Sequence, residues 1–441
     1  MRARDRICSS IARLTGAGRF AVVSAVGALI ALMSVGGASA TVRLGAPAHG
    51  SELLGQQAHR AAGKQSELSA VACVKPSDCW AVGESQNRSG AFVNEALRWN
   101  GRKWSKVKTP NPGGTAADDQ SELSGVACVS SSDCWAVGES ERGHSAAELN
   151  EALRWNGRKW SKVKTPNPGG TASEGHQSDL FGVTCVSASD CWAVGESQHG
   201  SSAPQLNEVL RFDGKKWSKV KTPNPGGMAF EDFSELFGVA CVSSSDCWAV
   251  GESQHSSSAA KLNEALRFNG KRWSQVKTFD PAGKDNGKTN ELFGVNCISA
   301  TDCWAVGGGA NPNKMVAFNE VLHWGGKKWS HVRTPQPSNK LSEFLNPLES
   351  VNCNSPTDCW AVGYYLNRQK TAILNEALHW NGRKWSHIHT PQPGGTHEVF
   401  NALFGVSCPA RSDCRAVGLI GLLGKFSTEA LHWNGKRWSS Q

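Results

Sequence analysis

After its first 40 residues, the 441-residue sequence has no apolar run that approaches the length of a membrane-spanning helix. It also lacks CxxC and similar closely spaced Cys/His sets, which disfavours zinc sites. Short catalytic motifs are missing too: no GxSxG elbow, P-loop or HExxH occurs, and no GxGxxG lies between a strand and a helix. These absences favour binding over catalysis, and we expect no cofactor and no metal.

Residues 1–40 have the pattern of a secretory signal peptide. Five arginines between Arg2 and Arg19 precede the apolar run 20–35, which is too short for a membrane anchor, and Ala38-Ser39-Ala40 is a small-residue cleavage site. We expect cleavage after Ala40 and a secreted, extracellular chain. Because five arginines and Asp5 leave, the formal charge falls from +9 to +5. This mild charge gives no reason to expect nucleic acid as a partner.

The remaining fourteen cysteines form seven pairs of equal spacing, whose first members recur every 55 to 57 residues. Such a period indicates a repeat architecture. In an exported protein the pairs are expected to be disulfides, since the spacing places both cysteines opposite each other across a tight hairpin. Each bond closes a loop of seven residues and contributes about 2 kcal/mol, so it fixes hairpin register more than overall stability. The predicted pairs are Cys73/Cys79, Cys128/Cys134, Cys185/Cys191, Cys241/Cys247, Cys297/Cys303, Cys353/Cys359 and Cys408/Cys414.

Each repeat has the pattern of four short strands, at 68–74, 79–85, 94–99 and 102–110 in the first copy. An Asn-Gly or similar pair, Asn100-Gly101 in that copy, separates the third and fourth strands and suits a two-residue type I′ turn. The sequence therefore predicts an all-β protein, a seven-bladed β-propeller with four antiparallel strands and one disulfide per blade. The blades are expected at about 66–114, 121–170, 178–227, 234–283, 290–338, 346–395 and 401–441, within a domain of residues 66–441.

At this point the copies resemble the kelch repeat, with an apolar first strand, a second strand ending in AVG, an aromatic residue before a turn, and a tryptophan that begins the fourth strand. The resemblance implies a propeller whose first strands line a central channel. A copper-radical oxidase of the kelch class is disfavoured, because such a site needs separate tyrosines and the only two here are adjacent. The last copy has Arg415 in place of a tryptophan and ends early, so segment 41–65, with Thr41 to Pro47, is expected to supply a ring-closing strand.

Several repeated residues are interpreted as structural. The tryptophans of the second and fourth strands are expected to pack between blades. Counting from the turn places the glutamate of the third strand, Glu95, opposite Lys106, which predicts ion pairs of about 0.2–1 kcal/mol. The same count places Arg98 opposite Lys103, an unfavourable pair that the aspartate before the second cysteine, Asp78, is expected to balance. A cationic ring that binds a phosphate-rich wall polymer is the alternative.

The loops between second and third strands and those between repeats differ among the copies, and chain direction places them at one end. We call this the variable end, and we expect it to carry the binding site, because function tends to lie on loops held by a rigid scaffold. Its predicted binding residues are Asp118, Asp119, Glu174, His176, Glu231, Asp232, Phe233, Asp285, Tyr364, Tyr365, His397 and Glu398.

Three functions remain open on the sequence. The first is a monomeric recognition scaffold that binds an extracellular glycan, a cell-wall polymer or a protein through the variable end. The second is a polysaccharide hydrolase or lyase that uses two loop carboxylates. The third is a structural spacer.

Overall fold

The computed structural model describes residues 65–441 except 144–145, 173–174, 315, 338–345 and 423–424. The predicted signal peptide and the segment Thr41 to Pro47 lie outside the described residues. The fold is all-β, and the only helix of the described part is the 3-10 turn η1 (Pro312–Lys314). No helix in this part is long and apolar enough to cross a membrane.

The described residues form twenty-eight strands, which follow one another as seven four-stranded antiparallel units. The first strands are β1 (Ser66–Lys75), β5 (Gln120–Ser130), β9 (His176–Ser187), β13 (Phe233–Ser243), β17 (Thr289–Ser299), β21 (Leu348–Ser355) and β25 (Val399–Ala410). The second strands are β2 (Asp78–Gln86), β6 (Asp133–Glu141), β10 (Asp190–His199), β14 (Asp246–Gln254), β18 (Asp302–Asn311), β22 (Asp358–Leu366) and β26 (Asp413–Leu422). The third strands are β3 (Phe92–Trp99), β7 (Leu149–Trp155), β11 (Gln205–Phe212), β15 (Leu262–Phe268), β19 (Val316–Trp324), β23 (Ile373–Trp380) and β27 (Lys425–Trp433). The fourth strands are β4 (Trp104–Lys106), β8 (Trp160–Lys162), β12 (Trp217–Lys219), β16 (Trp273–Gln275), β20 (Trp329–His331), β24 (Trp385–His387) and β28 (Trp438–Ser440).

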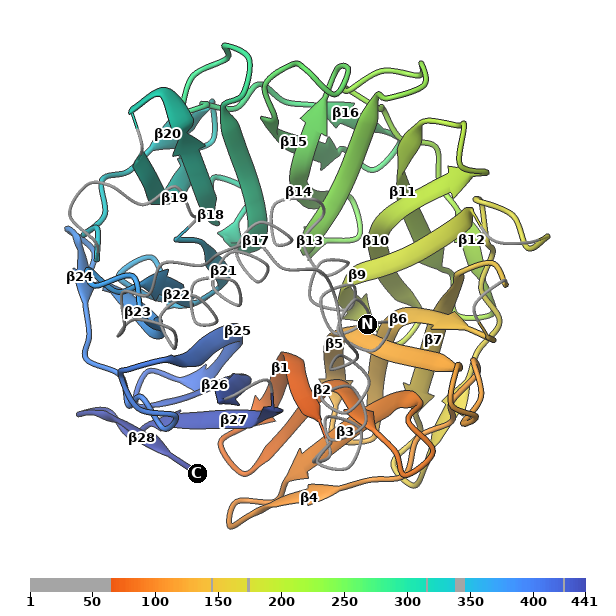
Figure 1. Ribbon diagram of the computed structural model, residues 1–441, viewed down its shortest axis with the longest axis horizontal. Coiled ribbons are helices and arrows are strands. Elements are labelled where there is room, and N and C mark those ends of the chain that lie inside the picture. The colour runs from red at the N-terminus through yellow and green to blue at the C-terminus, as the bar shows by residue number, and fades with distance from the viewer. Residues whose placement is uncertain (1–64, 144–145, 173–174, 315, 338–345, 423–424) are drawn as a thin grey trace, which may run out of the picture.

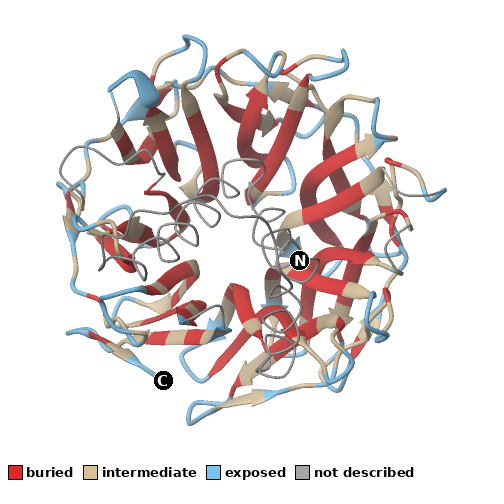
Figure 2. Ribbon diagram, in the orientation of Figure 1, coloured by how far each residue is buried: buried red, intermediate tan, exposed pale blue. Residues whose placement is uncertain are grey.

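The units stand around a central axis as in a β-propeller, with the first strand of each unit innermost and the fourth outermost (Figure 1). Buried residues fill the strands between neighbouring units, and exposed residues gather in the loops (Figure 2). The backbone does not form one continuous sheet. Single parallel bridges join units 1 and 2, units 3 and 4, and units 6 and 7, while unit 5 is a sheet of its own.

A disulfide joins the first two strands in every unit, as predicted. In units 1 to 6 the paired cysteines lie directly opposite each other, as Cys241 and Cys247 do. A β-bulge follows toward the variable end, because Leu236 lies opposite Gly251 whereas Gly238 lies opposite Val250. The bulge shifts the start of the first strand by one residue relative to its partner. The seven bonds are Cys73–Cys79, Cys128–Cys134, Cys185–Cys191, Cys241–Cys247, Cys297–Cys303, Cys353–Cys359 and Cys408–Cys414.

The disulfides also pack in the apolar core between units. The sequence analysis predicted only that they fix the register of the first hairpin. The second cysteine of each pair is 0% exposed, whereas the first is partly buried in units 1 to 6. In units 2 to 7 the second cysteine packs in one apolar cluster with the buried second-strand tryptophan of the preceding unit, as Cys134 does with Trp80. These residues are structural and offer no surface to a ligand. The fully buried cysteines are Cys79, Cys134, Cys191, Cys247, Cys303, Cys359 and Cys414.

Tryptophans pack neighbouring units together, as predicted. Trp192 of β10 is fully buried and contacts Phe268 and Trp273 of the next unit at ring-centroid distances of 4.7 and 5.4 Å. The same arrangement links Trp80 to Trp155 and Trp160, and it recurs at every interface from units 1 and 2 to units 6 and 7. Each contact buries a large aromatic area, which makes this layer a main source of cohesion between units.

Unit 7 meets unit 1 through a related contact. Arg415, in the position of the tryptophan, is 2% exposed and lies 4.4 Å from the ring of Trp99 in unit 1. Gly405 of β25 approaches Ala70 so closely that a Cβ there would lie 3.1 Å from the Ala70 Cα. The short strand β28 pairs with β27 like the fourth strand of the other units. Unit 7 therefore has its own fourth strand, and the expected ring-closing strand of segment 41–65 falls almost entirely outside the described residues.

Candidate functional site

At the end opposite the variable end, the repeated charges neutralise one another. Asp133 accepts two hydrogen bonds from the guanidinium of Arg154, the shorter at 2.8 Å. A histidine replaces the arginine in the last three units, and His379 lies 2.6 Å from Asp358. The predicted pairing of the aspartate with the arginine or histidine is confirmed, whereas the second cation of each predicted pair, Lys103 in the first unit, is exposed on the loop. The equivalent pairs are Arg98–Asp78, Arg211–Asp190, Arg267–Asp246, His323–Asp302 and His432–Asp413.

The predicted turn between third and fourth strands is wrong. Trp99 lies opposite Trp104, so the loop has four residues instead of two. Asn100 accepts hydrogen bonds from two backbone N–H groups within the loop, at 3.0 and 3.1 Å. In this loop only Gly101 has a positive φ, 89°, whereas a type I′ turn requires two.

The longer loop shifts every pair of residues that was counted from it. Arg98 lies opposite Ser105, so the predicted like-charge pairs do not form. Lys106 lies opposite Leu97, although a diagonal ion pair joins its Nζ to Glu95 Oε1 at 3.5 Å.

The other third-strand glutamates bind the preceding unit instead of a lysine. Asn319 Nδ2 donates to Glu376 Oε1 at 2.9 Å, and both side chains are buried. Burial raises the pKa of these glutamates, to about 8 for Glu429. Their role is structural, as predicted, but through hydrogen bonds between units. The remaining pairs are Asn94–Glu151, Asn150–Glu208, Asn207–Glu264, Asn263–Glu320 and Asn375–Glu429.

Two aspartates predicted to bind a ligand stabilise loops. Asp119 accepts hydrogen bonds from the N–H groups of Ala116 and Gly143, at 2.8 and 3.2 Å. Asp232 does the same with Ala229 and Ser256, at 2.8 and 3.1 Å. The hydrogen bond from Ala229 is the main cause that lowers the pKa of Asp232.

Three aromatic residues predicted to bind a ligand lie partly or wholly in the core. Tyr364 is buried and packs against Phe404. Tyr365 packs beside a small apolar cluster, and its burial raises its pKa. The ring of Phe233 lies 5.0 Å from the Nζ of Lys261. These residues hold loops and strands together and present little surface to a ligand.

Most of the other predicted residues lie on loops, whereas His176 begins β9. Asp118, Glu231, Asp285, His397 and Glu398 are exposed. Asp285 pairs with Lys288, which lowers its pKa, and His176 packs edge-to-face on His199 at 4.8 Å. Glu174 lies outside the described residues.

One pair of loops at the variable end exposes large apolar side chains next to a carboxylate. Met228 and Phe230 are 64% and 61% exposed. Glu231, which follows them, has an unusual positive φ of 76° and accepts a hydrogen bond from Ser257 of the facing loop at 3.0 Å. Since that backbone conformation is costly for a residue other than glycine, the loop holds Glu231 in place.

Sequence reasoning missed a layer of buried carboxylates below the variable end. In units 1 to 4 an acidic residue of the first strand lies directly opposite a glutamate of the second. Each is at most 5% exposed. The repeated SEL and GES sequences show that both strands carry a glutamate in most units. Counting from the cysteine pair alone would place Glu67 opposite Ser85. The β-bulge shifts the register by one residue and places Glu67 opposite Glu84. The layer comprises Glu67/Glu84, Glu122/Glu139, Asp179/Glu196, Glu235/Glu252 and, in unit 5, Glu291.

Between units 4 and 5 this layer holds a buried ammonium group. Lys261 Nζ lies 2.8 Å from Glu252 Oε1 and 3.4 Å from Glu291 Oε1. Burial alone would lower the pKa of Lys261, but the two carboxylates outweigh it and raise that pKa.

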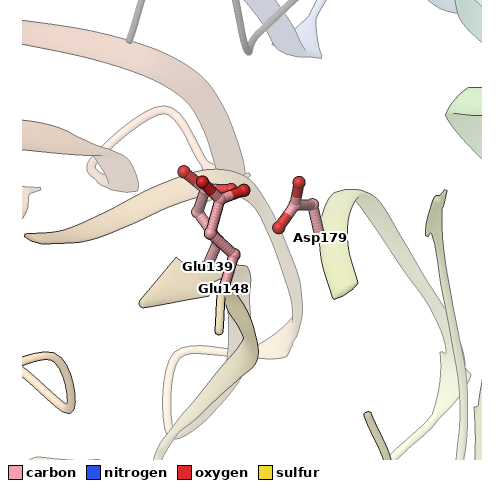
Figure 3. A group of neighbouring side chains, drawn as sticks. All are labelled: Glu139, Glu148 and Asp179. Carbon is pink, nitrogen blue, oxygen red and sulfur yellow. The ribbon is translucent and has the colours of Figure 1, made fainter. Parts of the chain in front are cut away.

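Between units 2 and 3 the corresponding place holds a third carboxylate. Glu139 of β6, Glu148 just before β7 and Asp179 of β9 point toward one another, and one oxygen of each lies within 4.8 Å of the others (Figure 3). Burial first, then the charges of Glu139 and Glu148, raise the pKa of Asp179 well above its usual value. By ligand type, this group could hold a hard metal cation.

No protein-family model and no curated protein matches the chain. Among solved structures it is similar to a polysaccharide lyase described as a PL25 ulvan lyase, with a TM-score of 0.51, 9% identity and coverage of 86% of this chain and 96% of that one. It is also similar to a GH74 xyloglucanase from Xanthomonas campestris (TM-score 0.49, 12% identity, 86% of this chain), but spans only 55% of that enzyme. A six-bladed β-propeller lectin from Aleuria aurantia has a TM-score of 0.39 at 10% identity, over 74% of this chain and 95% of the lectin. At these identities the likeness concerns the fold alone.

Proposed function

We propose that the chain is a secreted, monomeric, seven-bladed β-propeller of kelch-like type that recognises an extracellular glycan through its variable end. Seven four-stranded units and the contact of Arg415 with Trp99 support a closed ring. Seven disulfides agree with an oxidising compartment. The ulvan lyase, the xyloglucanase and the fucose lectin have names that refer to carbohydrates, which agrees with this choice of ligand.

The proposed glycan-binding surface lies on the two facing loops 228–233 and 254–260. Met228 and Phe230 are exposed two residues apart, which gives an apolar surface on which a sugar ring can lie. The carboxylate of Glu231 beside them can accept hydrogen bonds from sugar hydroxyls. An apolar surface with a few fixed polar groups is the usual composition of a ligand site.

The alternative of a hydrolase or lyase finds less support. The opposed carboxylates of the buried layer are at most 5% exposed, so a polymer does not reach them. Asp119 and Asp232 already accept hydrogen bonds from loop backbone.

A glycan array with the secreted chain tests the proposal. We expect binding to a defined set of glycans without product release, and at least a tenfold loss of affinity for Phe230→Ala and Glu231→Gln. Phe279→Ala is the matched control, because Phe279 is also half exposed but stacks on His331. Equal binding by Phe230→Ala and wild type, or turnover of a bound glycan, would contradict the proposal.

A further inference from the structure

The seven loops between third and fourth strands are strongly cationic. Each loop has four residues, and the last two are lysine or arginine in every unit. All of these residues are exposed. We call them the loop cations, and they are Arg102, Lys103, Arg158, Lys159, Lys215, Lys216, Lys271, Arg272, Lys327, Lys328, Arg383, Lys384, Lys436 and Arg437.

These loops separate the charge of the molecule. They contain fourteen cations and one acid, Asp213, which gives a formal charge of +13, whereas the whole chain from residue 41 onward has +5. The rest of the chain from residue 41 therefore has a formal charge of −8. Such a concentration of one sign of charge gives the loop end a positive potential that attracts anions.

Contacts with the turns between first and second strands hold the loops together at one end of the molecule. Arg98, just before the loop of unit 1, pairs with Asp78 and also donates to Ser131 O of unit 2 at 3.5 Å. Arg154 donates in the same way to Ala188 O of unit 3, at 3.2 Å. Because the units stand around a central axis (Figure 1), the loop cations follow one another around this end.

Within the described part of the chain, no loop cation forms an ion pair with a carboxylate. The aspartates of the neighbouring turns pair with an arginine or histidine of the third strand instead. Asp213, in the loop of unit 3, accepts hydrogen bonds from the backbone N–H groups of Lys215 and Lys216. Since neighbouring like charges repel one another, an external anion would relieve this repulsion.

The composition of the loops indicates recognition by charge and not by one fixed geometry. The loops of units 3 and 5 carry Lys215-Lys216 and Lys327-Lys328, so the planar fork of arginine is not present in every unit. An exposed cation gains little from a single anion, on the order of 0–1 kcal/mol. A ligand that carries many anionic groups on one chain gains affinity by contacting several loops at once.

The same loops are a poor fit to a membrane surface, because a membrane-bound surface element places apolar side chains among its cations. The loops consist of asparagine or aspartate, glycine, lysine and arginine. Among the described residues, the large apolar side chains exposed beside this end are four valines that follow the first cysteine, at 36–38% exposure. They are Val74, Val129, Val186 and Val242.

We propose that the loop cations bind a linear extracellular polymer whose repeats carry phosphate or sulfate ester groups. The exposed ammonium and guanidinium groups pair with successive ester groups along the polymer, and the release of counterions makes the affinity fall as the salt concentration rises. These loops lie at the end opposite the variable end, so the binding does not depend on the proposed glycan site.

Biolayer interferometry of the secreted chain tests the proposal with poly(glycerol phosphate) and, separately, dextran sulfate as the immobilised polymer. We expect binding to at least one of them at about 50 mM NaCl, and at least about tenfold weaker binding at about 200 mM. The polymer that binds identifies the ester group. Uncharged dextran should not bind, and Phe230→Ala, at the variable end, should bind the charged polymers as wild type does.

Two variants of equal net charge separate the loops from the rest of the surface. The loop variant should bind at least about tenfold more weakly at about 50 mM NaCl, because it lacks four of the contacts. The control variant, which changes four exposed lysines after the fourth strands, should stay within about threefold of wild type. The loop variant combines Arg102→Gln, Lys103→Gln, Arg158→Gln and Lys159→Gln, and the control combines Lys108→Gln, Lys164→Gln, Lys221→Gln and Lys277→Gln. Circular dichroism establishes that both variants are folded.

Two results would overturn the proposal. The first is that neither charged polymer binds wild type, including the case in which phosphatidylglycerol vesicles bind it, since the loops would then serve a membrane. The second is an equal loss of affinity in the two variants, which would show that net charge and not the loops determines binding.

Discussion

Units 1 to 4 and units 6 and 7 have the same backbone but differ in chemistry at one layer, and unit 5, where Glu291 lies opposite Gly308, is intermediate. In unit 1, Glu67 lies opposite Glu84. At the same positions of unit 7, Ala402 lies opposite Leu419. Beside them, Tyr364 of unit 6 belongs to an apolar cluster with Leu366, Ile373 and Ala402. The layer is thus acidic over one part of the ring and apolar over the other.

This difference shows which residues determine the fold. Disulfides, tryptophans and the Asn–Glu bonds between units occur in both parts. The carboxylate layer does not, and apolar residues such as Ala402 and Leu419 occupy the equivalent positions in unit 7. Units 6 and 7 therefore fold with apolar residues at positions that are acidic in units 1 to 4.

A second difference follows nearly the same division, with unit 5 on the other side. The partner of the aspartate is arginine in units 1 to 4 and histidine in units 5 to 7, as Arg154 and His379 show. Arginine keeps its charge at all ordinary pH values, whereas histidine is the side chain that changes charge near neutrality. For His432, burial and the nearby Arg415 lower the pKa.

The largest expected effect tests whether the shared framework is equally important in both parts. Trp192→Ala, in the acidic part, and Trp360→Ala, in the apolar part, should each lower the free energy of unfolding by about 3–5 kcal/mol, because each leaves a cavity between units. Chemical denaturation measures both. Losses that differ by more than about 2 kcal/mol would mean that the carboxylate layer contributes to cohesion after all.

The shared framework is also what the sequence predicted best. Cysteine spacing set the register of the first hairpin, and the position of tryptophan set the packing between units, since both depend on residues close together in each repeat. The pair Asn100-Gly101 led to a wrong prediction of a two-residue turn. The Asn100 side chain accepts backbone hydrogen bonds in the observed four-residue loop, and asparagine is typical of turns of both lengths.

The loops and the carboxylate layer could not be predicted in this way. Asp119 bonds to Gly143, on another loop 24 residues away, so its structural role depends on how the two loops meet. The pairing of Glu67 with Glu84 depends on a β-bulge that no turn or spacing signal marks. The contact of Cys134 with the cluster around Trp80 joins two units. Counting residues within one repeat cannot predict such a contact.

The next expected effect concerns the residue two positions before the third-strand asparagine. It is Lys261 in unit 4 and Ile373 in unit 6. Lys261→Met should cost about 3–5 kcal/mol at pH 8, because it leaves Glu252 and Glu291 buried without their cation. Ile373→Met at the equivalent position of the apolar part should cost less than about 1.5 kcal/mol. Denaturation at pH 8 and pH 5 measures the difference, which should shrink at pH 5 as the carboxyls take up protons. Equal costs for the two variants at pH 8 would contradict the assignment of Lys261 as the stabilising cation.

The smallest expected effect is the pH dependence of stability. Burial raises the pKa of Glu235, in the acidic part, to about 7, and that of Glu429, in the apolar part, to about 8. A raised pKa in the folded state means that the folded chain holds the proton more tightly. The resulting stability is complete below pH 4.5 and is lost as the pH rises through 7 for Glu235 and through 8 for Glu429.

Glutamine at either position removes this dependence while keeping the shape of the side chain. Relative to wild type, the gain between pH 5 and pH 9 should be at most about 3 kcal/mol for Glu235→Gln and about 4 kcal/mol for Glu429→Gln, since one pKa unit corresponds to about 1.4 kcal/mol. The gain should be complete near pH 8 for Glu235→Gln but only near pH 9 for Glu429→Gln. Denaturation midpoints across this range measure the two curves. Parallel curves for wild type and both variants would show that these carboxyls titrate at ordinary values, and the contrast between the two parts of the ring would then be one of packing and not of charge.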